Sequence, residues 1–290
     1  MRSDPGSARP DVDEVTVTGD LTDVVDLGGA VAGADVVLHL AARVHVMHDR
    51  GPNLDAIYRR ANVEPTLRLA HAAAAAGARR FVYVSSVKAV AECSAGPLDE
   101  RSSPAPDDAY GRSKLEAERA LTALNRPGFT VVIVRPPLVY GPGVRGNFQR
   151  LIGLVRAAAA AHLPLPLGGA CALRSLVYVG NLADALALVC THPEACGTYF
   201  VRDGEDLGTA ALVHRLGTSL GIRPRLVTFP AAALRVLGTA IGRRAEVDRL
   251  FNELRVDDGR LRRELQWDPP FDVDAGLAAT VHSAAAGRQT

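Results

Sequence analysis

The chain has 290 residues, which is enough for one large domain or for a core with a smaller lobe. Its hydrophobic content of 48% allows a sizeable buried core, and its net charge of +1, without a basic block, gives no electrostatic reason to expect nucleic acid or a membrane surface as a partner. The four cysteines lack CxxC spacing and the polar N-terminus is unlike a signal peptide, so we expect no disulfide scaffold and a cytoplasmic protein.

Strands and helices alternate through the first half of the chain. Short apolar runs indicate buried parallel strands, and longer periodic stretches indicate the helices between them. In chain order, we expect a strand at 35–40, a helix at 53–77, a strand at 80–86, a helix at 109–124 and a strand at 130–135. This alternation is typical of a parallel α/β sheet with right-handed crossovers.

The second half of the chain is more mixed. In chain order, we expect a helix at 148–161, a strand at 176–179, a helix at 181–192, a strand at 199–201 and helices at 209–220 and 231–242. A tail punctuated by prolines follows.

Lysine is rare in this chain. Of its 33 basic residues, only Lys88 and Lys114 are lysines and the others are arginines. Lysine offers a compact ammonium whose pKa shifts readily, which arginine does not, so both lysines are candidates for a functional site.

Tyr110 and Lys114 are four residues apart on an expected helix, so their side chains share one face. A neighbouring ammonium lowers the pKa of a phenol toward neutrality, which predicts Tyr110 as a general acid/base. Ser85 and Ser86 end the preceding strand, where hydroxyls face the ligand crevice of a parallel sheet and can bind a substrate oxygen. A solvated pair on an ordinary amphipathic helix is the alternative, and the position of the pair one crossover after the serines argues against it.

Three motifs follow one another along the chain: Ser85-Ser86, Tyr110-Gly-Arg-Ser-Lys114 and Val134-Arg-Pro-Pro-Leu-Val-Tyr-Gly-Pro142. They resemble the extended short-chain dehydrogenase/reductases, and more narrowly the NAD-dependent epimerase/dehydratase family. Further matching pieces extend the resemblance from about residue 14 to 285. Segments 43–48 and 164–168 are similar to UDP-glucose 4-epimerase-like proteins and to 4-ketoreductases of UDP-6-deoxy-N-acetylhexosamines.

The resemblance implies an α/β fold, with a Rossmann-type parallel sheet flanked by helices and a small mixed substrate-binding lobe. The implied division puts 1–142 with 175–202 in a truncated dinucleotide-binding core. It puts 143–174 with 203–285 in the lobe, and leaves 286–290 as a tail.

The resemblance also implies roles for individual residues. Tyr110 would be the acid/base, Lys114 the residue that lowers its pKa and binds the cofactor ribose, and Ser86 the ligand of the substrate oxygen. The other residues implied to contact NAD or NADP are Asp20, Leu21, Leu40, Ala41, Ala42, Asn62, Ser85 and Pro136. Those implied to contact a UDP-sugar are Lys88, Asn147 and Arg174, the last through its diphosphate.

Plainer explanations stay open for some of these residues. Lys88 is equally compatible with a solvated loop lysine, and Arg174 with a surface arginine. Trp267 is expected to pack the tail against the body of the protein.

Three histidines lie close together in the sequence: His39, His45 and His48. Asp49 is the one carboxylate or cysteine that joins them at ligand spacing, so we expect no metal site.

The Gly-rich turn with which this family opens has no counterpart in the sequence. That turn lets a helix N-terminus approach the cofactor pyrophosphate, and the nearest match, 28–33, precedes the strand at 35–40 within an expected helix. We therefore expect the opening β-α-β unit to be missing, which leaves strands at 15–17 and 36–40 with unpaired edges and uncovered apolar surface. Either the start of the chain is truncated or misplaced, which the intact remaining site favours, or the chain is a defective remnant.

Two reactions at the sugar C4 use the same motifs. Oxidation and reduction at one site give 4-epimerisation, and entry of an external reduced cofactor gives 4-keto reduction, in either case for polysaccharide biosynthesis. A non-catalytic protein on the same fold and a reductase of a non-sugar substrate are the alternatives, and Arg174 argues against the second. The resemblance implies a homodimer through the helices at 53–77 and 109–124.

Overall fold

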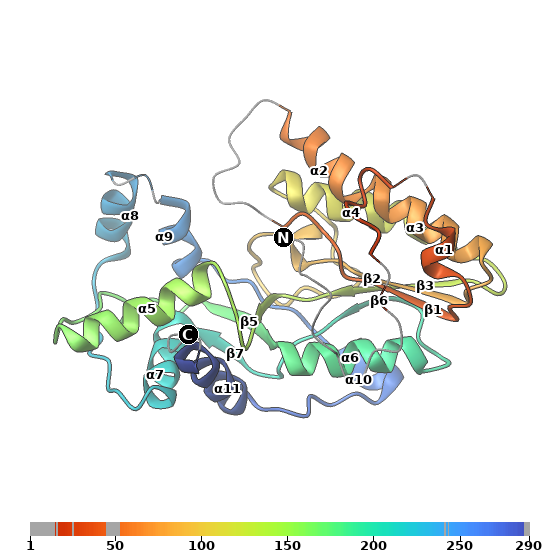
Figure 1. Cartoon of the computed structure of the whole chain (residues 1–290). Coiled ribbons are helices and arrows are strands. Elements are labelled where there is room, and N and C mark those ends of the chain that lie inside the picture. Colours follow the sequence, from red (N-terminus) through yellow and green to blue (C-terminus); the bar gives the residue numbers. More distant parts are fainter. Residues whose placement is uncertain are drawn as a thin grey trace.

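Two sheets organise the chain in the computed structural model, which describes residues 15, 17–24, 26–44, 53–240, 242 and 244–286 (Figure 1). The main sheet has the strand order β1-β2-β3-β6 and its strands are all parallel. The smaller sheet has the order β4-β5-β7 and is mixed, because β5 pairs with β4 in parallel and with β7 in antiparallel orientation. The strands are β1 Val36–His39, β2 Arg80–Val84, β3 Thr130–Arg135, β4 Leu138–Tyr140, β5 Leu173–Tyr178, β6 Gly197–Phe200 and β7 Asp206–Gly208. The predicted α/β fold with a parallel main sheet is confirmed.

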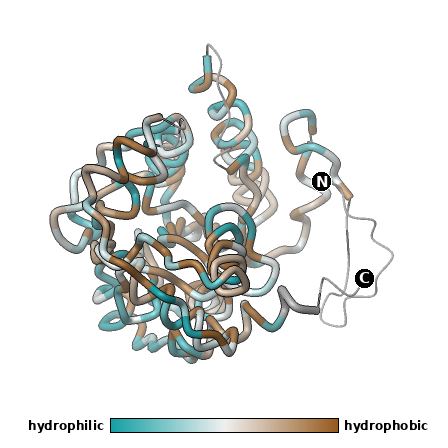
Figure 2. The backbone as a smooth tube through the Cα atoms, turned by 90° about the vertical axis from the view of Figure 1, so that its left-hand side faces the viewer, coloured by the Kyte–Doolittle hydropathy of each residue, from teal (hydrophilic) through white to brown (hydrophobic). Residues whose placement is uncertain are grey.

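Helices cover both faces of the main sheet (Figure 1). One layer contains α1 Gly28–Val31, α2 Leu54–Asn62, α3 Glu64–Ala75 and α4 Ala109–Thr122. The opposite layer contains α6 Val179–Thr191 and α10 Gly259–Leu265. The smaller sheet carries α5 Asn147–Ala160, α7 Thr209–Ser219 and α11 Val273–Ala286, and beside it stand α8 Ala231–Ala240 and α9 Arg244–Phe251. Apolar and polar residues are interspersed along most of the helices, which allows these helices to bury one face (Figure 2).

Alternation of side chains along the central strands explains the three layers. In β2, Phe81 and Tyr83 pack with α3 and α4, whereas Val82 between them packs with α6 and α10. Both faces are therefore buried, as the nearly continuous apolar sequence of the strand predicts.

β1 is the open edge of the main sheet. It pairs with β2 on one side, and no described strand pairs with its other side. Leu38 is 38% exposed and Leu40, just beyond the strand, is 61% exposed. The expected strand is therefore present but only half-buried, because one of its edges and part of its apolar surface lie uncovered. The strand expected at 15–17 includes Thr16, which lies outside the described residues.

Two sequence predictions differ from the structure. The single helix expected at 53–77 is two helices, α2 and α3, because Pro65 stands in the first turn of α3 and lacks the N–H that a continuous helix needs. The tail, for which the sequence predicts no elements, contains α9, α10 and α11. Trp267 is buried and its Nε1 donates to Asp184 Oδ1 at 2.7 Å, which confirms that it packs the tail against α6.

No helix in the described part of the chain has both the length and the apolar character needed to span a bilayer. The boundaries of the predicted core and lobe stay a prediction. β4 and β5 lie with β7 in the smaller sheet and not in the main sheet.

Candidate active site

The carboxyl end of β2 leads directly into the predicted site. The Ser85 N–H donates to Val134 O at 2.8 Å, which continues the pairing with β3. Ser86 then leaves the sheet and begins a short 3₁₀ helix, Val87–Ala89, where its hydroxyl accepts from the Lys88 N–H at 3.2 Å. Both serines thus lie at the strand end, as expected for residues at the ligand crevice.

The start of α4 packs closely against this 3₁₀ helix. Asp108 caps α4 by accepting the Gly111 N–H at 2.7 Å. A Cβ on Gly111 would lie 2.3 Å from the Lys88 carbonyl oxygen, so only glycine allows this approach. The contact brings Tyr110 close to Ser86, whose side chain favours the phenolate form of Tyr110.

The pKa of Tyr110 moves in the opposite direction to the one predicted from the sequence. Burial raises the pKa of Tyr110 to about 12, and the side chain of Ser86 only partly opposes this. The charge of Asp108 and the neighbouring Tyr58, whose ring meets Tyr110 edge-on at 6.2 Å, raise the pKa further. Burial of the phenol therefore sets the direction of the shift, and the predicted lowering by Lys114 stays a prediction.

Lys114 lies one turn beyond Tyr110 on α4, as expected, and is only 2% exposed. Its Nζ donates to Val84 O at 2.7 Å and lies 4.2 Å from the centroid of the Tyr83 ring. Burial lowers the pKa of Lys114 to about 7, although the carboxylate of Glu118 acts in the opposite direction.

Lys88 is held by carboxylates. Its Nζ forms ion pairs with Glu92 and, at 2.7 Å, with Asp108, the cap of α4. Glu92 also faces Arg249 of α9 at 3.7 Å. The explanation as a solvated loop lysine is therefore wrong, and contact with a substrate stays a prediction.

Asn62 ties the crevice segment to α4. Its side chain accepts from the Arg43 N–H at 2.7 Å and donates to Arg43 O at 3.1 Å and to Ser113 Oγ at 3.0 Å. The Ser113 hydroxyl in turn donates to Tyr110 O at 2.7 Å. The predicted crevice residues Leu40, Ala41 and Ala42 immediately precede Arg43, so this network fixes them relative to the helix that carries Tyr110.

Three further cofactor candidates lie at two separate places. Pro136 is buried at the end of β3 and its carbonyl accepts from the Val87 N–H at 2.9 Å, so it lies beside the serine turn. Asp20 and Leu21 form a turn that Arg68 of α3 holds through Leu21 O at 2.5 Å. No described contact joins this turn to Tyr110.

Arg174 and Asn147 are the remaining substrate candidates. The Nη1 of Arg174 in β5 donates to Asn252 O at 2.9 Å and to Arg249 O at 3.5 Å. Burial lowers the pKa of Arg174 and the charge of Glu92 opposes this, so Arg174 faces the carboxylate that holds Lys88. Asn147 is exposed at the first position of α5.

His39 is the one member of the histidine group that the structure describes, and His45 and His48 lie outside the described residues. It lies in β1, where its Nε2 and Thr66 Oγ1 are 2.9 Å apart. Burial, followed by the charge of Lys114, lowers the pKa of His39 to about 4.

Sequence reasoning missed Tyr83, Glu118 and Arg135. Both carboxylate oxygens of Glu118 accept from Arg135, at 2.6 and 3.0 Å, and both side chains are buried. The proximity of Glu118 to Lys114 was predictable from the sequence, because Glu118 lies four residues after Lys114 on the same face of the helix. Arg135 and Tyr83 had no local signal.

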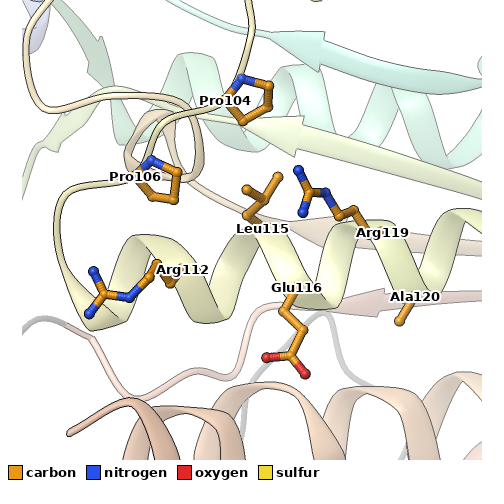
Figure 3. A pocket seen from close by; sticks show the side chains of 7 residues that line it. All are labelled: Pro104, Pro106, Arg112, Leu115, Glu116, Arg119 and Ala120. Atoms are coloured by element: carbon orange, nitrogen blue, oxygen red, sulfur yellow. The ribbon is translucent and has the colours of Figure 1, made fainter.

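A hollow of about 780 Å³ lies on a different face of α4 (Figure 3). Its lining residues are Pro104, Pro106, Arg112, Leu115, Glu116, Arg119 and Ala120. Helical spacing places Arg112, Glu116 and Arg119 opposite Lys114, so the hollow is separate from the candidate active site.

The chain is similar to several known proteins. A UDP-glucose 4-epimerase of Vibrio cholerae is 36% identical over 270 residues, which cover 91% of this chain and 81% of that protein. A 3-beta-hydroxysteroid dehydrogenase of Mycolicibacterium neoaurum is 28% identical over 289 residues, with 91% and 78% covered. The structure of MoeE5 in complex with UDP-glucose and NAD superposes with a TM-score of 0.70 at 25% identity, covering 94% of this chain and 86% of that one.

The family comparison covers all four strands of the main sheet and the whole serine, tyrosine and lysine set. The model of the NAD dependent epimerase/dehydratase family matches residues 2–201, more than half of the chain. The chain therefore belongs to the NAD dependent epimerase/dehydratase family.

Proposed function

We propose that this protein is a nucleotide-sugar enzyme of polysaccharide biosynthesis that acts at C4, as a 4-epimerase or a 4-ketoreductase. The observation that carries the proposal is that Tyr110 at the start of α4 lies beside Ser86 at the end of β2, with buried Lys114 one turn further along α4. The 36% identity to a UDP-glucose 4-epimerase supports a UDP-hexose as substrate, and a UDP-6-deoxy-N-acetylhexosamine is the other candidate.

The residues of the crevice fit the nicotinamide and ribose end of NAD or NADP. The Ser85 hydroxyl is buried without a hydrogen-bond partner among the described residues, and Lys114 has donors beyond the one that Val84 O accepts. Ala41 and Ala42 are small enough to let a ring approach the backbone. The nicotinamide supplies hydride exchange when bound, and the MoeE5 complex supports NAD.

Tyr110 and Ser86 handle the proton of the reacting sugar oxygen. With a pKa of about 12, Tyr110 carries its proton at neutral pH and is ready to donate it when a C4 ketone is reduced. Ser86 binds both Tyr110 and the sugar oxygen, and so orients the transfer. Lys114 holds the cofactor ribose and favours the phenolate when the proton moves the other way.

Product analysis with purified protein tests the proposal. An epimerase converts UDP-glucose to its C4 epimer without net consumption of NADH, whereas a ketoreductase oxidises NAD(P)H in proportion to the 4-keto sugar added. The amount of dinucleotide that the purified protein binds separates both from a non-catalytic protein. Absence of dinucleotide binding and of both reactions overturns the proposal.

A reductase of a non-sugar substrate is the second candidate, favoured by the similarity to a 3-beta-hydroxysteroid dehydrogenase. Arg174→Met separates the two. If Arg174 binds a diphosphate, its loss raises the KM for the UDP-sugar about 10- to 100-fold, as expected for a hydrogen bond to a charged group. Arg255→Met is the matched control. Arg255 forms an ion pair with Glu253, close in sequence to Asn252, whose carbonyl accepts from Arg174. An unchanged KM in Arg174→Met shows that Arg174 does not bind the diphosphate, which removes the argument against a non-sugar substrate, and turnover of a hydroxysteroid in place of the UDP-sugar favours that candidate.

We also propose a homodimer through α2 and α4. Ile57 on α2 is 43% exposed, and the hollow beside α4 leaves apolar and charged groups uncovered. Light scattering after gel filtration should give twice the mass of one chain, and Ile57→Arg should halve it. A monomer at micromolar concentration contradicts this assembly.

A further inference from the structure

The ammonium of Lys114 is buried with few partners. Its side chain is 2% exposed, and the Val84 carbonyl, at 2.7 Å, is the one hydrogen-bond acceptor among the described residues. An ammonium has three donors, so one carbonyl does not fix its position or compensate its loss of water.

The ring of Tyr83 supplies a second contact. It is fully buried on the face of the main sheet that α4 covers, and the Lys114 Nζ lies 4.2 Å from its centroid. That distance is well within the range of cation–π attraction, which strengthens where water is excluded.

The hydroxyl of Tyr83 makes no such contribution. It is buried and has no hydrogen-bond partner among the described residues. The contributions of the ring and of the hydroxyl of Tyr83 can therefore be measured separately, because Tyr83→Phe keeps the ring and removes only the hydroxyl, which forms no hydrogen bond with a described residue.

Charges on neighbouring elements complete the surroundings of the ammonium. Glu118, one turn further along α4, favours the charged form of Lys114, and Arg135 of β3 holds both oxygens of that carboxylate. The charged or titratable groups that face Lys114 are Tyr110 and Glu118 of α4, His39 of β1, Tyr83 of β2 and, through Glu118, Arg135 of β3.

We propose that Tyr83 is a positioning residue for Lys114, and that its ring face holds the ammonium in its charged form at the Val84 carbonyl. The inference rests on the proposed function, because Lys114 serves the reaction through Tyr110 and the cofactor ribose. Tyr83 itself lies in the strand and touches no reacting atom.

The scarcity of lysine makes a direct test possible. The chain contains two lysines, so protein labelled with [¹³Cε]lysine gives two ε-methylene signals, and Lys88→Arg identifies the one from Lys114. In the wild-type protein, the ring current of Tyr83 should move the ε-protons of Lys114 upfield of those of Lys88. This measurement needs no variant of Tyr83, and the absence of an upfield shift overturns the inference.

Titration of the same signal measures the role of the ring. The pKa of Lys114, about 7 in the wild type, should fall by about one pH unit in Tyr83→Met and stay in place in Tyr83→Phe. His39 and Tyr110, with pKa values of about 4 and 12, titrate outside this window, and Tyr83 titrates well above it. An unchanged pKa in Tyr83→Met overturns the inference.

Kinetics provide the functional readout. The pH profile of kcat in Tyr83→Met should shift by the same amount as the Lys114 signal, and Tyr83→Phe should restore it. A uniform loss of activity without a shifted profile indicates only a packing role and contradicts the proposal. The lysine titration does not depend on activity, so failure of the proposed function and failure of this inference give different results.

Discussion

Tyr110 and Lys114 lie four residues apart on one helix, yet burial moves their pKa values in opposite directions. The reason is that burial disfavours whichever form is charged, the phenolate of one and the ammonium of the other. At neutral pH Tyr110 therefore holds its proton while Lys114, with a pKa of about 7, is close to half protonated.

Replacement of the proposed acid/base tests its role directly. Tyr110→Phe should lower kcat about 10²- to 10⁴-fold, the usual contribution of general acid–base catalysis, while the dinucleotide affinity stays close to that of the wild type. The matched control is Tyr58→Phe, since the Tyr58 ring adjoins Tyr110 but its hydroxyl donates to Val44 O at 3.3 Å. Comparable losses in the two variants would contradict a special role for Tyr110.

Buried His39 predicts how stability depends on pH. Its pKa is about 4 in the folded protein and about 6.5 when unfolded, so between these values the unfolded state binds more protons. Stability should therefore fall as the pH drops from about 6.5 to 4, by roughly 3 kcal/mol in total for this group. Urea unfolding of wild type and His39→Asn at several pH values measures the effect. An equally steep pH dependence in both proteins would rule His39 out as its source.

The part of the site that is local in sequence could be predicted, and the part that depends on packing could not. Spacing of four residues on a helix placed Tyr110 and Lys114 on one face, and the strand pattern placed Ser86 beside them. The direction of the Tyr110 pKa shift was wrong because the sequence does not show how deeply the phenol is buried. Tyr83 needed the sheet register that sets it beneath α4.

At the level of elements, the N-terminus of α4 depends on a single carboxylate. Asp108 accepts the Gly111 N–H and also pairs with Lys88, which anchors the helix to the strand end that carries Ser86. Burial alone would raise the pKa of Asp108, but the hydrogen bonds from Lys88 and Gly111 outweigh it and hold the pKa below its usual value.

Loss of this cap should loosen the first turn of α4. Asp108→Ala should reduce the free energy of unfolding by about 1–2 kcal/mol, as for other N-caps, and should lower kcat because Tyr110 lies two residues away. Asp107→Ala is the control, because the carboxylate of Asp107 is exposed and forms no described capping hydrogen bond with α4. Denaturant unfolding followed by circular dichroism measures both, and equal stabilities would show that the cap contributes nothing.

Element boundaries were predictable where the pattern is long. The strands at β2 and β3 and the helix at α4 appear within a few residues of their expected positions. β4 and β7 are three residues each, too short for any periodicity, and form because β5 lies between them. The break between α2 and α3 carried a visible signal in Pro65, which the Ala-rich sequence after it obscured.

At the scale of the molecule, a buried contact joins the smaller sheet to the end of the main sheet. Asp203, which follows β6 of the main sheet, accepts from Tyr140 of β4 at 2.7 Å and from Asn181 of α6 at 2.8 Å. Because Asp203 joins Tyr140 of the smaller sheet to the end of β6, movement of the smaller sheet relative to the main sheet would break a buried hydrogen bond. We therefore expect the two parts to unfold together.

Trp267 gives the molecule an optical reporter of that cooperativity. It is the one tryptophan in the chain, it is 4% exposed, and it packs with the main-sheet residues Val134 and Tyr199. Its fluorescence should be blue-shifted in the folded protein and move to the red when the tail leaves α6. In a urea titration, the emission midpoint should coincide with the loss of helical ellipticity. A red shift at a lower urea concentration would instead mean that the tail detaches from α6 before the rest of the protein unfolds. The fluorescence of Trp267 would then follow this detachment in real time.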